Sequence, residues 1–146
     1  MKKWVYNEDG TLKEAYDENN VPTSYAYNTN KLLETVTNVK GDSITLEYDS
    51  DFNLAQVSLP DGNSSKWHYD NRGNCTKAIN PLGAEAFYQY DVVNRVISAD
   101  LPDGNHVQMA YNAYGDVVHA KDKYTEAHFE YTILGKAKVR RQGKRE

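Results

Sequence analysis

The 146-residue chain contains one cysteine, Cys75, so no disulfide can form within it. Its apolar stretches are short, and none approaches the roughly 20 residues of a membrane-spanning helix. The opening segment, Met1-Lys2-Lys3-Trp4, is not typical of a signal peptide, because Trp4 and Tyr6 already belong to an alternating strand pattern. We therefore expect no disulfide framework, no signal peptide and no membrane insertion.

Patterns for helices and for catalysis are also missing. No segment places apolar residues at a 3.6-residue spacing between capping residues. No histidine makes an H-x-H or H-x-x-x-H pair with another, and there is no cysteine cluster, so we expect no metal and no cofactor. Cys75 occupies a place that Leu, Val or Ala fills elsewhere, which favours a small buried residue over a nucleophile. We expect no enzyme activity.

What the chain does have is tyrosine at a fixed interval. Six of these residues lie 21 positions apart, and a seventh follows after 20: Tyr6, Tyr27, Tyr48, Tyr69, Tyr90, Tyr111 and Tyr131. A period of this length is typical of repeat proteins, in which each unit is a small element that must stack on its neighbours. We expect residues 1–146 to form a single array of six units of 20–21 residues, from Tyr6 to Tyr131, with a half-unit at each end.

Each unit contains two turn signals. Four positions after the tyrosine, glycine can adopt positive φ after four of the seven tyrosines, at Gly10, Gly73, Gly115 and Gly135. Asn94 fills this place after a fifth tyrosine, whereas Lys31 and Phe52 fill it after the other two, where the turn could shift to Asn30 or Asn53. Half a repeat later, a proline and a glycine form a second turn in three units, at Pro60 and Gly62, Pro81 and Gly83, and Pro102 and Gly104. Recurring carboxylates at these turns are explained by capping of the backbone: Asp49, Asp61, Asp70, Asp91 and Asp103.

The residues before each tyrosine alternate between apolar and polar, as in Ala86-Phe87-Tyr88-Gln89-Tyr90, which predicts a strand with one buried face. After each tyrosine, the apolar positions lie six and nine residues on, as at Val96 and Ala99, and so differ in parity. Either a β-bulge resets the register or the second residue packs on the opposite face, and the sequence does not decide between them. The fold class that follows is all-β: a repetitive antiparallel β-hairpin meander of about 14 short strands without a substantial helix.

The combined pattern resembles the YD or Rhs repeat. The resemblance runs from Tyr6 to about Arg140, is clearest in Tyr69 to Gly83 (Y-D-N-R-G-N-C-T-K-A-I-N-P-L-G), and includes Tyr-Asp itself at Tyr48, Tyr69 and Tyr90. In that family the hairpins form a long sheet that spirals into a hollow shell. Family members include bacterial polymorphic toxins, insecticidal toxin-complex components and the animal teneurins, and in the bacterial proteins the shell encloses a variable toxin.

The resemblance implies a non-catalytic structural segment of a shell that encloses or presents a toxin or effector, within a secreted, cell-surface or injected parent. The acidic D-P-x-G motif that closes such shells is absent, because Asn80-Pro81-Leu82-Gly83 has Asn at the acidic place. The alternative is an adhesion module whose outer face binds carbohydrate or protein. Expected partners are the remainder of a longer shell or another copy of the chain, with glycan as a further possibility.

Charge adds one local feature. The net charge is −4, yet residues 136–146 contain six basic residues and one acid. Because no basic stripe with interleaved aromatics recurs in the other units, we expect no nucleic-acid binding. Residues 141–146 are expected to be a frayed basic tail.

Overall fold

The computed structural model describes residues 1–143, which form antiparallel β-strands and tight turns with no helix. The odd-numbered strands all end at a repeat tyrosine: β1 (Lys3–Tyr6), β3 (Pro22–Tyr27), β5 (Ser43–Tyr48), β7 (Ser64–Tyr69), β9 (Glu85–Tyr90), β11 (His106–Tyr111) and β13 (Thr125–Tyr131). The even-numbered strands follow the tyrosine turn: β2 (Leu12–Tyr16), β4 (Leu33–Thr37), β6 (Leu54–Ser58), β8 (Cys75–Ile79), β10 (Val96–Asp100), β12 (Val117–Lys121) and β14 (Ala137–Gly143). The predicted all-β meander is confirmed.

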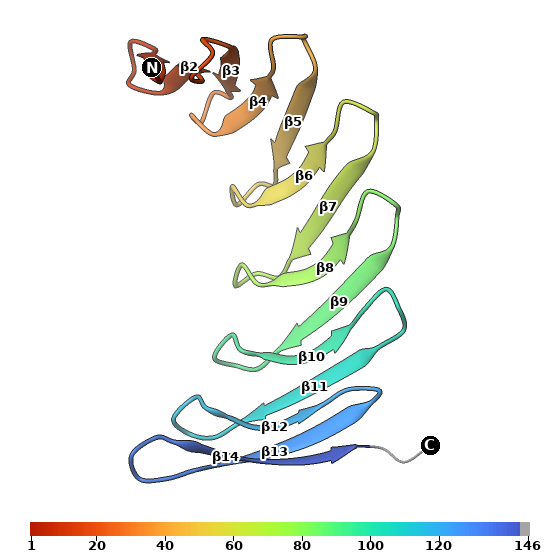
Figure 1. Ribbon diagram of the computed structural model, residues 1–146. Helices are drawn as coiled ribbons and strands as arrows, with labels where there is room; N and C mark the ends of the chain where they lie inside the picture. The colour runs from red at the N-terminus through yellow and green to blue at the C-terminus, as the bar shows by residue number, and fades with distance from the viewer. Residues whose placement is uncertain (144–146) are drawn as a thin grey trace. The chain divides into compact units, whose positions relative to one another are not determined.

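Strand order in the 14-stranded sheet follows the chain from β1 to β14, as the colours of Figure 1 trace. Contacts divide the chain into two compact units. The first contains residues 1–67 and 80–83, and the second contains residues 68–79 and those from Ala84 onward. Within the described residues, no helix is long and apolar enough to cross a membrane.

Both kinds of turn use the same hydrogen bonds. In the turn that follows Tyr69, the Gly73 amide donates to the Asp70 carbonyl at 3.1 Å, and the Asp70 amide donates to the Asn74 carbonyl at 2.9 Å. In the proline turn at Pro60, the Gly62 amide donates to the Leu59 carbonyl at 3.0 Å. The fourth residue of each of these turns has positive φ, at 80° for Gly73 and 88° for Gly62. This is the geometry expected for a turn closed by a left-handed residue.

Two turns keep their position, although their sequences also allowed a shift by one residue. Lys31 and Phe52 themselves take the left-handed conformation, with φ of 62° and 65°, in place of Asn30 and Asn53. Their amides donate to Asn28 and Asp49 in the same way as glycine amides do elsewhere. The hydrogen bonds of the turn therefore determine the backbone conformation, even where the residue type disfavours positive φ. Asn94 also has positive φ, at 66°, as its type predicts.

A β-bulge settles the parity problem. In the β9–β10 pair, Val96 lies opposite Tyr90 but Ser98 lies opposite Gln89, so Ile97 is an extra residue. The same shift occurs after Leu12, Leu33, Leu54 and Val117. Each bulge returns the small apolar residue to the face that the preceding apolar residue occupies. The alternative, packing on opposite faces, is wrong.

The best-buried side chains are small. Ala86, Ala99 and Ala127 retain 7%, 8% and 8% of their exposure, and no other hydrophobic residue in the described part is as well buried. Ala99 lies between Tyr88 on β9 and Val107 on β11, so larger neighbours cover it from both sides. On this apolar face, the best-buried small residue of β10 is therefore covered by larger, partly exposed neighbours on both adjacent strands.

The last hairpin differs from the others. Tyr131 lies opposite Ala137 and the pairing continues without a shift to Thr125 opposite Gly143. Because β14 has no bulge, its apolar residues, Ala137 and Val139, keep the same parity. Strand pairing includes Arg141, Gln142 and Gly143, so the expected frayed tail does not begin at residue 141. The rest of that expected tail, residues 144–146, lies outside the described residues.

Candidate functional site

The repeat tyrosines tie neighbouring strands together through their phenol groups. Five of their hydroxyls donate to the backbone carbonyl at the start of the preceding even-numbered strand, at 2.6–2.9 Å. The donor and acceptor pairs are Tyr27 with Leu12, Tyr48 with Leu33, Tyr90 with Cys75, Tyr111 with Val96, and Tyr131 with Val117. Tyr69 ends β7 at the equivalent place, and Tyr6 ends β1 with 61% exposure.

The strand pairing shows what the phenol adds. Pairing of β2 with β3 runs only from Glu14 to Tyr16, so the ladder stops short of Leu12. The Leu12 carbonyl then takes its hydrogen bond from Tyr27, which itself lies opposite Leu33 on β4. Tyr27 on β3 thus links three consecutive strands, through its phenol to β2 and through strand pairing to β4. Phenylalanine has no hydroxyl, so it would leave this partly buried carbonyl without the phenol donor.

We expect Tyr90→Phe to lower the free energy of unfolding by about 0.5–1.5 kcal/mol, because it removes the hydroxyl donor to Cys75 and leaves the ring in place. Chemical denaturation of the whole chain measures the change. Tyr114→Phe is the matched control, since Tyr114 is 92% exposed at a turn tip. Equal stability of the two variants would contradict the assigned bond.

Asp and Asn residues after the tyrosine hold the turn with their side chains. The Asp91 carboxylate oxygen Oδ1 accepts from the amides of Val93 and Arg95, both at 3.0 Å. Asp49 and Asp70 accept equivalent pairs of amides, and Asp61 caps Asn63 in the proline turn. Asp103 caps Asn105 in the same way. These bonds confirm the capping interpretation of the recurring carboxylates.

Those backbone hydrogen bonds lower the pKa of Asp49, Asp61, Asp70 and Asp91 below the ordinary value. A carboxyl whose folded pKa is lowered adds stability above its unfolded pKa of about 3.9, and that stability is lost as the pH falls through the folded pKa. We therefore expect the urea midpoint to fall as the pH drops below about 4.

Asp49→Asn serves as the internal control for this acid effect. Asn28 and Asn112 occupy equivalent places after a repeat tyrosine and accept the equivalent amides, so the variant should fold at neutral pH. It should show a shallower loss of stability in acid, because one titrating carboxylate has been removed. A urea midpoint that does not change in acid would contradict the assignment.

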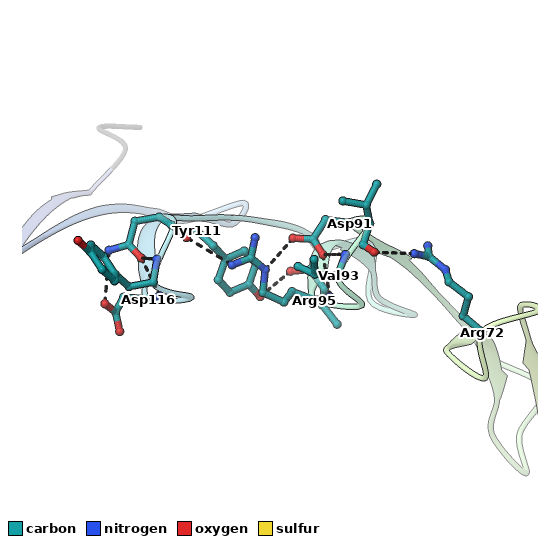
Figure 2. A network of polar contacts seen from close by, with 10 residues as sticks. Arg72, Asp91, Val93, Arg95, Tyr111 and Asp116 are labelled. Atoms are coloured by element: carbon teal, nitrogen blue, oxygen red, sulfur yellow. Dashed lines mark hydrogen bonds and ion pairs between the residues drawn. The ribbon is translucent and has the colours of Figure 1, made fainter.

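Arginines connect successive tyrosine turns in the second unit, and Figure 2 shows this network. The Arg95 Nε donates to Asp91 Oδ2 at 2.7 Å, and its Nη1 reaches the Asn112 carbonyl at 3.4 Å. The Arg95 guanidinium also lies 4.6 Å from the centre of the Tyr111 ring. One turn earlier, the Arg72 Nη1 donates to the Val92 carbonyl at 3.0 Å. These contacts run from repeat to repeat along the turn edge, a feature that the period alone does not predict.

The remaining repeat positions lie where the sequence placed them. Pro60, Pro81 and Pro102 occupy the second residue of their turns, and the following glycines have positive φ: Gly62, Gly83 and Gly104. The glycines of the tyrosine turns share that conformation, at Gly10, Gly73, Gly115 and Gly135. Their role in defining the repeat remains a prediction that mutagenesis must test.

Among the nucleophile and histidine candidates, strand pairing places two histidines opposite each other. The Cys75 thiol is partly buried, and burial raises its pKa, so little thiolate is present to react. His106 contacts Asp100 at 2.6 Å on the surface. His119 and His128, however, lie directly opposite each other on β12 and β13. The spacing of histidines in the sequence does not reveal this pair, because strand register and not closeness in sequence brings the two residues together.

The geometry defines the chain as a bulged β-hairpin repeat with tyrosine-linked strands. Residues 2–119 match the family model described as Teneurin YD-shell, and the chain therefore belongs to that family. A search of curated proteins found no match.

Solved structures share the fold at low sequence identity. A chain of the Photorhabdus luminescens Tc holotoxin pore, carrying the mutation TccC3-D651A, aligns with a TM-score of 0.79 and 13% identity over 97% of this chain. A chain of the TcdB2-TccC3-Cdc42 crystal structure aligns with a TM-score of 0.76 and 13% identity over 94%. TcdB2-TccC3 without the hypervariable C-terminal region gives 0.70 and 15% over 89%. The chain spans only 8–9% of these structures' own chains.

Proposed function

We propose that the chain is a non-catalytic wall segment of a longer YD-repeat shell that encloses or presents a toxin or effector. The observation that carries the proposal is the repeating bulged hairpin, in which five repeat tyrosines each link three strands and one face of the sheet is apolar. Family membership and the likeness to Tc toxin chains support a structural shell role. The expected partner is the remainder of the shell.

The polar contacts support a structural role in a second way. The phenol, carboxylate and guanidinium groups described above are all used in bonds within or between repeats. Such bonds stiffen a thin sheet whose best-buried residues are only alanines. We propose that the parent protein is secreted, displayed at the cell surface or injected.

Protease protection in the parent polypeptide tests the enclosing function. We expect a segment enclosed by the intact shell to resist trypsin, and Ala99→Asp, which places a charge on the apolar face, to expose it. Ser98→Asp introduces the same charge on the opposite face of β10 and should leave protection intact. Equal digestion of the enclosed segment in the wild type and in both variants would contradict the proposal.

A glycan array tests the adhesion alternative on the same chain. Aromatic rings such as Trp67 and Tyr88 could stack on a sugar, but these two lie on the apolar face and are only partly exposed. We therefore expect no glycan to be retained. Specific retention that Tyr88→Ala abolishes would favour the adhesion module over the wall segment.

A further inference from the structure

A compact group of side chains of metal-binding types lies on the polar face of β12 and β13, opposite the face that carries the repeat tyrosines. His119 and His128 are cross-strand partners, and their rings lie 4.6 Å apart at an interplanar angle of 30°. Glu126 precedes His128 by two residues, so both side chains project from the same face of β13. The two strands are neighbours in the sheet (Figure 1).

The ligand atoms of these three residues are already close. His119 Nε2 lies 2.8 Å from Glu126 Oε1, and His128 Nε2 lies 3.7 Å from the same oxygen. One ligand atom from each residue falls within 4.8 Å of the others. We propose that His119, Glu126 and His128 form a binding site for a divalent transition-metal ion of the Zn²⁺ type.

The donor set fits that chemistry. Imidazole nitrogen and carboxylate oxygen bind Zn²⁺ at about 2.0–2.2 Å, so two donors on one tetrahedral ion lie about 3.3 Å apart. The observed separations approach that value, and the partly exposed side chains can rotate to reach it. Three protein ligands leave a fourth position open to water, and imidazole–carboxylate sets also suit neighbouring first-row metals.

The site differs from the other histidine–carboxylate contact in the second unit. His106 contacts Asp100 at 2.6 Å, which provides one imidazole and one carboxylate. The β12–β13 group adds a second imidazole held opposite the first by the strand register. An ion pair alone requires only one histidine, whereas a metal ion makes use of both.

Nearby positive charge limits the affinity. Lys121 lies opposite Glu126, and Arg140 lies opposite His128 on β14. The Lys121 charge acts on the Glu126 carboxylate that the metal would use. Lys121→Gln should therefore tighten Zn²⁺ binding, by up to about fivefold at low salt. A purely structural histidine pair would not show this gain.

The experiment is a calorimetric titration of the full chain with Zn²⁺ at neutral pH. We expect one ion per chain, released by a chelator. His119→Gln, Glu126→Gln and His128→Gln should each weaken binding by at least about tenfold, since even outer-shell changes reach that size. The matched control, His106→Gln, should bind as the wild type does. Thermal melts without metal show whether each variant is folded.

A second measurement needs no variant. In the wild-type chain, Zn²⁺ should shift the imidazole resonances of His119 and His128 together while those of His68 and His106 stay in place. The proposal is overturned if the wild type takes up no Zn²⁺, if His106→Gln weakens binding as much as His128→Gln, or if all four histidines respond alike.

Discussion

Ala99→Asp is expected to lower the free energy of unfolding by about 2–4 kcal/mol, which is the largest effect of any single change considered. Ala99 is 8% exposed and lies between Tyr88 and Val107 on the apolar face. A carboxylate there loses water and gains no partner, and it also displaces the larger side chains that cover the position. Urea denaturation followed by circular dichroism measures the change.

Ser98→Asp is the matched control for this prediction. Ser98 is the preceding residue on β10, so it projects from the opposite face, where its cross-strand partners are Gln89 and Gln108. Both variants place aspartate in the same strand, so any difference between them reports the face and not strand propensity. We expect Ser98→Asp to change stability by less than about 1 kcal/mol. Equal losses in the two variants would show that the assignment of faces is wrong.

Gly104→Val is expected to cost about 1–3 kcal/mol, the second-largest effect. Gly104 closes a proline turn with φ of 80°, and its amide donates to the Leu101 carbonyl at 3.0 Å. A Cβ at this position would meet nothing within 4 Å, so lack of space is not the reason. The cost arises because a β-branched residue resists positive φ.

Gly104→Asn separates backbone strain from the general effect of adding a side chain. Asn20 and Asn94 already close turns with φ of 60° and 66°. Asparagine at position 104 should therefore cost less than valine, in denaturation experiments on both variants. If valine and asparagine were equally tolerated, the conformation would not constrain this position.

The period and the turn chemistry could be predicted because they depend on local residue types. Tyrosine spacing, Pro-x-Gly and the alternation before Tyr90 each indicate a hairpin without any knowledge of distant contacts. The family resemblance drew on the same residues, and the match over residues 2–119 confirms it.

The bulge and the phenol bonds could not be predicted in this way. Residues six and nine places after a tyrosine differ in parity, and only the observed pairing of Ser98 with Gln89 shows which alternative holds. The hydroxyl of Tyr90 bonds to a carbonyl 15 residues earlier, a partner that no side-chain pattern marks. The His119–His128 pair was missed for a similar reason, since register across a turn determines it.

Residue type also failed where backbone geometry overrode it. Phe52 is a poor residue for positive φ, yet its amide makes the turn bond to Asp49 at 3.1 Å. The neighbouring Asn53 was the better candidate by type alone. Phe52 keeps this unfavourable conformation because the Asp49 carboxylate and the two flanking strands fix the turn.

Cross-strand nuclear Overhauser effects in β9 and β10 test the central claim most directly, namely that a β-bulge after the tyrosine turn places the small apolar residue of β10 on the face that carries the repeat tyrosines. With Ile97 as the extra residue, Ser98 lies opposite Gln89 and Ala99 lies opposite Tyr88. Without a bulge, continuing from Val96 opposite Tyr90 would place Ser98 opposite Tyr88. We expect backbone effects from Ala99 to both Tyr88 and Val107. Effects from Ser98 to Tyr88 in their place would contradict the account.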